Sequence, residues 1–405
     1  MSAAADTRLD IYSSASKADP FPVFARYRAT EPVVRVALPD KTPGFLVTRY
    51  DDVTQLLKDP RFAKSRYNAM TPEQLKKQPW MPAMFKSVER NMLDLDPPDH
   101  TRLRDLVHKA FTPRLIEQMR ARVQSLADEL LDKVAKKGEM DLIRDYALPL
   151  PITIIAEILG VPTRDQHKFY KWSNVIVSGD QFKGGLRVLP AVFMFVRYVR
   201  GFFKARRADP KDDLGSALVA AEQAGDKLSE DELVAMVLIL LVAGYETTVN
   251  LIGSGVLELL RHQGELDRLR AEPTLIKTAV EELLRFTSPV FLATERYARE
   301  DVTLHGVTIP RGNMAFGVIG SANRDESVFK DPDRLDIGRD PNKHLSFGLG
   351  VHYCLGAPLA RLEAQIAIDT LLRRMPRLRL RSAPSTLKWR PSLILRGLEA
   401  LPVLF

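Results

Sequence analysis

The chain has 405 residues, of which 45% are hydrophobic and 27% charged, so it can bury a large core and is not a disordered chain by composition. Its 59 Lys and Arg residues outnumber its 51 Asp and Glu residues, but the charges are interspersed along the chain. No nucleic-acid-binding signature accompanies them, so we expect no nucleic-acid partner. A positive surface patch that binds an acidic protein stays open. The single cysteine, Cys354, excludes an intrachain disulfide and suits a reducing compartment, which predicts a cytoplasmic protein.

The first elements follow a weakly patterned N-terminus. Residues 1–19 lack the basic start and apolar run of a secretory signal, and we expect them to form a flexible extension. No repeat, low-complexity tract or linker interrupts residues 20–405, which are predicted to form one large domain. Within it, residues 33–38 and 45–49 are β-rich runs joined by the turn-rich segment PDKTPG, a pattern typical of a hairpin. Apolar side chains at three- to four-residue steps predict a helix over residues 114–136.

The clearest helix begins at Ser229, which forms a capping box with Glu232, and extends to about residue 262. Such a helix is far longer than average and should cross the whole molecule. Its uncharged apolar stretch, residues 233–243, is too short to span a bilayer, so we expect no membrane partner.

Shorter elements fill the C-terminal part of the chain. The pattern predicts helices over residues 274–286 and from near Pro358 to about residue 374, and short strands over residues 302–304, 307–309 and 314–319. Helix clearly dominates, so the predicted fold class is mainly α with a minor β component (α+β).

The single cysteine lies in the segment FGLGVHYCLG, residues 347–356, just before the last predicted helix. Its glycines permit tight turns, and a helix N-terminus stabilises negative charge, so Cys354 should ionise readily. Two other interpretations stay open from the residues alone. Cys354 could be a buried, inert cysteine, or a nucleophile with His352 as its partner.

The middle of the long helix reads AGYETT, residues 243–248. A glycine inside a helix costs about 1 kcal/mol relative to alanine, and threonine is only a moderate helix former. This run predicts a local distortion, in which a threonine hydroxyl competes for a backbone carbonyl. An ordinary buried helix with a packing glycine at Gly244 is the alternative.

Two further spacings place charged residues on one face of a helix. Glu282 and Arg285 are three residues apart, and His100 and Arg104 are four apart at a helix start. By themselves, both patterns are also typical of solvated surface charges.

The pattern Phe-Gly-x-Gly-x-His-x-Cys-x-Gly resembles the haem-ligand loop of the cytochrome P450 family, and the other motifs occur in that family's chain order. The resemblance implies a single large domain with a long central helix over a haem b group. It implies that Cys354 is the thiolate ligand of the haem iron, and that the cofactor is also contacted by the residues Phe347, Gly348, His352 and Gly356.

The same resemblance assigns roles to the remaining motifs. Ala243 and Gly244 would belong to the oxygen-binding groove, where Thr247 contacts O2 and Glu246 relays protons from solvent. Contacts to the haem propionates are implied for His100, Arg104, Arg296 and His352, and a structural charge network is implied for Glu282, Arg285 and Arg339.

The implied function is that of a haem-thiolate monooxygenase of secondary metabolism, which inserts one oxygen atom of O2 into a hydrophobic small molecule by hydroxylation or epoxidation. The substrate would be of fatty acid, terpenoid, steroid or polyketide type. We expect residues 67–93, 174–203, 290–291 and 393–395 to contact it. The candidate residues of the substrate pocket are Met84, Phe85, Val290, Phe291 and Ile394.

No flavin or nicotinamide fingerprint occurs in the sequence, so we expect the electrons to come from separate proteins, a ferredoxin and a ferredoxin reductase. We also expect the protein to be a monomer. Two alternatives use the same fold: a peroxide-driven peroxygenase and a non-catalytic haem sensor or carrier. Glu246 and Thr247 argue against both, because neither needs an acid beside an alcohol.

Overall fold

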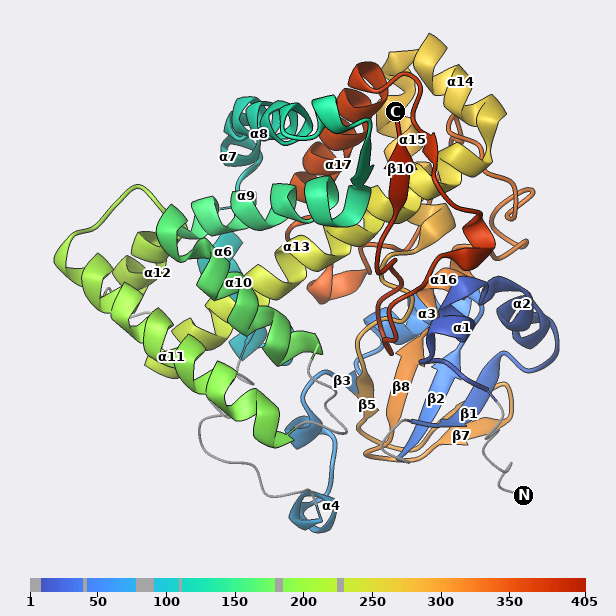
Figure 1. Ribbon diagram of the computed structural model, residues 1–405. Helices are drawn as coiled ribbons and strands as arrows, with labels where there is room; N and C mark the ends of the chain where they lie inside the picture. The colour runs from blue at the N-terminus through green and yellow to red at the C-terminus, as the bar shows by residue number, and fades with distance from the viewer. Residues whose placement is uncertain (1–8, 39–41, 78–90, 109–110, 179–184, 224–228) are drawn as a thin grey trace. The chain divides into compact units, whose positions relative to one another are not determined.

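The computed structural model describes residues 9–38, 42–77, 91–108, 111–178, 185–223 and 229–405 (Figure 1). These residues divide between two compact units, each built from separate segments of the chain. The first unit comprises Met1–Thr71, Met119–Leu150 and Thr247–Phe405, and the second comprises Pro72–Gln118 and Pro151–Glu246. The assignment of residues 20–405 to a single domain stays a prediction.

The first unit contains a five-stranded sheet with the strand order β1-β2-β8-β5-β3. Its strands are β1 (Val33–Ala37), β2 (Pro43–Val47), β3 (Phe62–Ala63), β5 (Arg296–Ala298) and β8 (Met314–Gly317). The predicted hairpin is confirmed, because β1 and β2 pair antiparallel. The strand predicted over residues 314–319 ends at Gly317, since the chain then turns into the short helix α16 (Ile319–Ala322).

Two smaller sheets complete the β component of the first unit. One joins β4 (Glu139–Asp141), β10 (Pro402–Leu404) and β9 (Arg379–Leu380), and the other is the predicted hairpin of β6 (Val302–Leu304) and β7 (Val307–Ile309).

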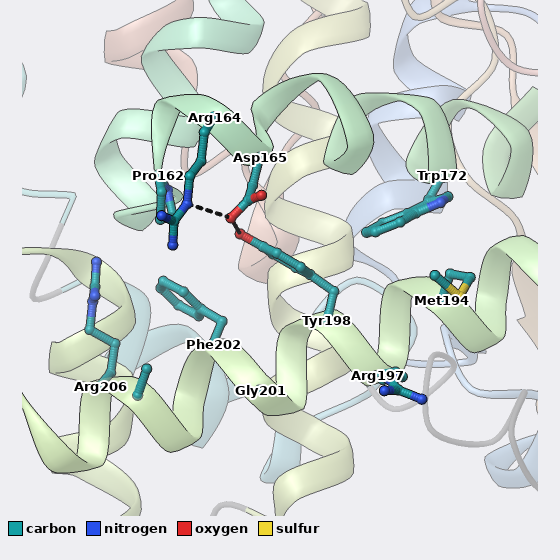
Figure 2. Close-up of a pocket in the computed structure, with 11 residues that line it drawn as sticks. Pro162, Arg164, Asp165, Trp172, Met194, Arg197, Tyr198, Gly201, Phe202 and Arg206 are labelled. Atoms are coloured by element: carbon teal, nitrogen blue, oxygen red, sulfur yellow. Dashed lines mark hydrogen bonds and ion pairs between the residues drawn. The ribbon is translucent and has the colours of Figure 1, made fainter.

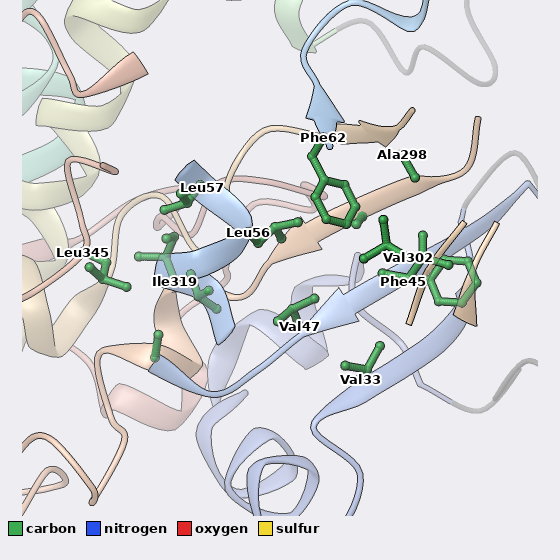
Figure 3. Close-up of a cluster of buried hydrophobic side chains, with 14 residues drawn as sticks. Val33, Phe45, Val47, Leu56, Leu57, Phe62, Ala298, Val302, Ile319 and Leu345 are labelled. Atoms are coloured by element: carbon green, nitrogen blue, oxygen red, sulfur yellow. The ribbon is translucent and has the colours of Figure 1, made fainter. Parts of the chain in front are cut away.

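The side chains of β2 alternate between two hydrophobic clusters, as the pleat of a strand requires. Phe45 and Val47 belong to the cluster that contains Leu56 of α3 (Tyr50–Lys58), which Figure 3 shows. Leu46 belongs to the cluster on the other face, which contains Phe24 of α2 (Phe21–Thr30). Burial on both faces explains why this strand reads as continuously apolar.

Part of the expected flexible extension is folded in the structure. Residues 14–18 form α1 (Ser14–Ala18), and both Ile11 and Lys17 are buried. The Lys17 ammonium donates to the Leu393 carbonyl at 3.2 Å, and the Trp389 amide donates to the Ser14 hydroxyl at 3.1 Å. The prediction was wrong for residues 9–19 because contacts with distant parts of the chain, which leave no local pattern, hold this segment.

The first unit also contains the C-terminal part of α13 (Glu230–Arg261). Its other longer helices are α8 (Arg120–Asp132), α14 (Gln263–Ala271), α15 (Ile276–Thr287) and α17 (Ala357–Arg374). The helix predicted over residues 114–136 is divided at Met119 into α7 (Pro113–Gln118) and α8. The helix predicted over residues 274–286 is α15, which ends at Thr287. Ser288 follows it in a left-handed conformation with φ 45°, immediately before Pro289.

The second unit is helical. It contains α4 (Pro72–Lys76), α6 (Asp99–His108), α7, most of α9 (Pro149–Leu159), α10 (Thr163–Ser178), α11 (Gly185–Ala208), α12 (Leu214–Gln223) and the first part of α13. The predicted capping box starts α13: the Ser229 amide donates to the Glu232 carboxylate at 2.8 Å, and the Glu232 amide donates to the Ser229 hydroxyl at 3.2 Å. Within the described chain, α13 alone is long and apolar enough to cross a membrane, but 67% of its most apolar segment is buried in the protein.

Candidate functional site

The loop before α17 folds around Cys354. The Cys354 amide donates to the Phe347 carbonyl at 2.9 Å, which closes the loop on itself. Gly348 and Gly350 have φ angles of 67° and 72°, a left-handed conformation that favours glycine. Cys354 is half-buried and lies three residues before the N-terminus of α17, where the helix dipole stabilises a thiolate.

Space for a cofactor exists beside this loop. A Cβ atom added to Gly348 would meet no atom within 4 Å, and a Cβ atom on Gly356 would lie 4.0 Å from the Cys354 sulfur. Among the described residues, no group of three or more His, Cys, Asp or Glu side chains could hold a metal ion. A lone thiolate instead suits a metal whose other ligands come from a cofactor, so these residues fit the implied haem.

A charge network that the sequence analysis missed supports the Cys354 loop. Arg361 of α17 donates to both carboxylate oxygens of Glu281 of α15 at 2.7 and 2.8 Å, and the His344 ring lies 3.0 Å from the same carboxylate. Burial alone would raise the pKa of Glu281, but the hydrogen bonds from Arg361 and His344 hold it at about 2. The Arg361 guanidinium lies 4.4 Å from the ring centre of Phe347, so the network fixes this ring of the loop.

Glu282 and Arg285 form a fully buried ion pair rather than a solvated one. Arg285 donates to both carboxylate oxygens of Glu282 at 2.8 Å, and both side chains have no exposed surface. Arg339 joins the pair with its Nε atom 3.1 Å from Glu282, as the predicted third member would. Arg285 also donates to the Asn323 and Pro332 carbonyls, so the pair ties α15 to the loops that lead toward Cys354.

The long helix α13 runs through Ala243 and Thr247 as continuous α-helix. The competition of a threonine hydroxyl for a backbone carbonyl in this run stays a prediction. A Cβ atom on Gly244 would lie 3.0 Å from Ile155 of α9, which identifies Gly244 as a packing glycine. Ala243 is exposed although most of α13 is buried, and both Glu246 and Thr247 are half-buried. Glu246 is the last residue of the second unit and Thr247 the first of the next segment of the first unit.

The four predicted propionate contacts lie in both units. In the second unit, His100 is buried and Arg104 half-buried, one turn apart on α6. Their neighbour Arg102 donates to Glu232 of α13 at 2.7 Å, a contact that fixes α6 against α13 and that the sequence analysis missed. In the first unit, Arg296 is buried on β5 and His352 is half-buried beside Cys354.

The predicted substrate contacts have mixed outcomes. Met84 and Phe85 lie outside the described residues. Val290 and Ile394 are half-buried, and the Phe291 amide donates to the Ile394 carbonyl at 2.8 Å, so the two predicted segments are neighbours.

Phe291 is buried in the hydrophobic cluster that contains Phe24, with ring centres 5.4 Å apart. Its assignment to a substrate pocket stays a prediction, as do those of Val290 and Ile394.

Comparisons with known proteins show similarity over almost the whole chain, well beyond these motifs. The family model for cytochrome P450 matches residues 198–386. Polyketide biosynthesis cytochrome P450 PksS of Bacillus subtilis (strain 168) is 47% identical over 390 residues, which cover 95% of each chain.

Solved structures agree with this similarity. The structure of PksS has a TM-score of 0.90 and 45% identity, and it covers 98% of this chain and 99% of its own. The myxobacterial cytochrome P450 CYP267B1 in complex with myristic acid has a TM-score of 0.92 and 43% identity over 98% of both chains. The predicted fold class, mainly α with a minor β component, is confirmed.

Proposed function

Because the chain belongs to the cytochrome P450 family, whose members are monooxygenases that use haem b and O2, we propose that it hydroxylates or epoxidises a polyketide-type molecule. The observation that carries the proposal is Cys354: it is the single cysteine of the chain, and its loop leaves space beside the sulfur. That the enzyme is an oxidoreductase acting on hydrophobic molecules follows from the family. The residues that perform each step are our proposal.

Cys354 would hold the cofactor through its sulfur. Its position before α17 favours the thiolate, and Phe347 and Arg361 keep the loop in place through the contacts described above. When bound, the haem supplies the activation of O2, which a thiolate ligand promotes. His100, Arg104, Arg296 and His352 would bind its two carboxylates, because guanidinium and imidazolium groups match carboxylates in charge and geometry.

Glu246 and Thr247 would deliver protons to the reacting oxygen. Both are half-buried on α13, so they can connect solvent with an enclosed site. A carboxylate can carry a proton inward, and an adjacent hydroxyl can pass it on while holding the oxygen by a hydrogen bond. The exposed Ala243, one turn before Thr247, leaves this side of the helix free of bulky side chains.

The relatives favour a polyketide or a fatty acid as substrate. PksS is described as a polyketide biosynthesis enzyme, and CYP267B1 was solved in complex with myristic acid. Val290 and Ile394 would contribute apolar contacts from adjacent segments. A polyketide is therefore the first class to screen, and a fatty acid the second.

Electrons would come from a ferredoxin and its reductase. Val351 and Tyr353, on either side of His352 and next to Cys354, are exposed large apolar side chains, which suit a protein-docking surface. The net charge of +8 complements an acidic partner. NADH-driven turnover with a ferredoxin should fall as salt rises, while peroxide-driven turnover of the same protein should not.

The absorption spectrum of the reduced, carbon monoxide-treated protein tests the core of the proposal. A Soret band shifted far to the red, as thiolate-ligated ferrous haem gives, is expected for the wild type and not for Cys354→Ala. A spectrum typical of histidine ligation, or an unchanged spectrum in the variant, would overturn the assignment of Cys354. Polyketides and fatty acids can then be screened by the spin-state change that a bound substrate causes.

A further inference from the structure

The second unit contains a pocket of about 470 Å³ between α10 and α11, which Figure 2 shows. Its volume lies in the range of small-molecule sites. The pocket faces the solvent side of α11: Arg197 and Gly201 line it and are exposed, whereas Val199 and Phe203 of the same helix are buried. None of the residues named above for haem or proton chemistry lines it, although its α11 side belongs to residues 174–203, which the sequence analysis assigned to substrate contact.

Aromatic rings form much of its wall. Trp172 of α10 and Tyr198 of α11 have ring centres 5.8 Å apart, and Phe202 lies one turn further along α11. The Tyr198 hydroxyl donates to the Asp165 carboxylate at 3.3 Å, and burial together with this carboxylate raises the pKa of Tyr198, so the ring stays uncharged. Such a wall favours a flat, apolar ligand that can pack against rings.

The charge around the pocket is positive. Three arginines line it against a single carboxylate, that of Asp165. Asp165 already accepts from Tyr198 and lies 3.8 Å from Arg164, and Arg206 is held by Asp213 at 2.7 Å. Arg197 is exposed, and among the described residues no carboxylate lies within ion-pair distance of it, which leaves its guanidinium available for an anionic ligand.

Gly201 lines the pocket without a side chain. It lies inside the 24-residue helix α11, where a glycine costs about 1 kcal/mol relative to alanine. A Cβ atom on Gly201 would meet nothing within 4 Å, so packing does not require this glycine. By contrast, a Cβ atom on Gly215 would lie 2.6 Å from Phe202. At this position the pocket wall is therefore backbone without a side chain.

We propose that this pocket binds a flat, apolar organic anion of low mass, with its rings against Trp172 and Phe202 and its carboxylate or sulfonate at Arg197. The proposal stands apart from the haem chemistry, because no residue of that site takes part. The probe is 8-anilinonaphthalene-1-sulfonate, which has flat rings and one negative charge, and its uncharged analogue N-phenyl-1-naphthylamine separates the contribution of the charge.

The experiment measures dye fluorescence on the haem-loaded protein and four variants. Gly201→Trp fills the pocket, and its matched control is Gly264→Trp, at an exposed helical glycine of α14 whose added Cβ would also meet nothing within 4 Å. Arg197→Glu reverses the charge at the pocket, and Lys204→Glu makes the same change at another exposed position of α11.

The wild type should bind the sulfonate dye saturably at one site, and Gly201→Trp should abolish this binding. Arg197→Glu should weaken it roughly fivefold, the value of an exposed ion pair of about 1 kcal/mol, and both controls should bind as the wild type does. The uncharged analogue should not respond to Arg197→Glu. Equal dye binding by the wild type and Gly201→Trp, or no saturable binding, would overturn the proposal. If Gly201→Trp does not fold, unchanged binding by Arg197→Glu would overturn it.

Discussion

Glu281→Gln tests whether the network behind the Cys354 loop stabilises the protein as its geometry indicates. The pKa of Glu281 is lowered from 4.5 to about 2, which corresponds to about 3 kcal/mol of stabilisation of the ionised form. The Glu281 side chain is 27% exposed, so solvent screening reduces the expected loss at pH 7 to about 2 kcal/mol. The control Glu129→Gln removes a half-exposed pair with Arg122 and should cost less than about 1 kcal/mol.

The pH dependence of this stabilisation has a defined sign. The pKa of Glu281 in the folded protein lies below that of the unfolded chain, so the contribution is complete above pH 4.5 and is lost as pH falls toward 2. By pH 4 the wild type should have lost about 1 kcal/mol through this group, whereas Glu281→Gln should lose none of it.

Urea unfolding of the haem-loaded protein, followed by circular dichroism between pH 4 and 7, measures both quantities. The difference in unfolding free energy between the wild type and Glu281→Gln should be constant above pH 5.5 and shrink below pH 4.5. Parallel curves for the two proteins over the whole range would refute the assignment of the lowered pKa to Glu281. An equal loss in Glu129→Gln would show that the cost is not specific to the network.

Three further predictions concern other sites. Thr247→Ala should retain the carbon monoxide spectrum but divert electrons from product to hydrogen peroxide. The yields of product and peroxide per NADH measure this diversion. An equal product yield per NADH in the wild type and the variant would contradict the role of Thr247. Arg339→Ala should lower the free energy of unfolding, measured in urea, by about 2 kcal/mol, and Arg285→Lys should lower it by about 3–5 kcal/mol. The reason is that Glu282 keeps its main partner, Arg285, only in the first variant. A larger loss in Arg339→Ala than in Arg285→Lys would contradict the network. Burial raises the pKa of Glu363 well above 4.5, and neither of its carboxylate oxygens has a hydrogen-bond partner among the described residues. Wild-type stability should therefore fall above pH 4.5 by up to about 1.4 kcal/mol per pH unit. Glu363→Gln should remove this slope, and an unchanged slope would show that Glu363 does not cause it.

The elements that could be predicted from the sequence are those with a local cause. Ser229 and Glu232 are three residues apart and form the capping box that starts α13. The hairpin of β1 and β2 depends on a short turn between two β-rich runs. The loop around Cys354 likewise holds its glycines and its cysteine within ten residues, so its motif is readable without knowledge of the fold.

Interactions between distant residues explain what the sequence did not reveal. Glu281 and Arg361 are 80 residues apart, and each alone is an ordinary charged residue on a helix. Residues 9–19, LDIYSSASKAD, mix polar and apolar side chains, yet Ile11 and Lys17 are both buried, and the segment contacts residues 389–393. Phe291 likewise packs in a cluster with Phe24 and Tyr27, more than 260 residues away in the chain, and its position next to Val290 gives no sign of this.

Two glycines inside helices have roles that the sequence alone does not distinguish. Gly244 and Gly201 weaken their helices by the same local cost of about 1 kcal/mol. A side chain at Gly244 would press on Ile155, so this glycine permits α9 and α13 to pack closely. A side chain at Gly201 would meet no atom, so close packing cannot explain it, and an alanine there should stabilise α11. Only the surroundings separate a glycine that allows two helices to pack closely from one that borders open space.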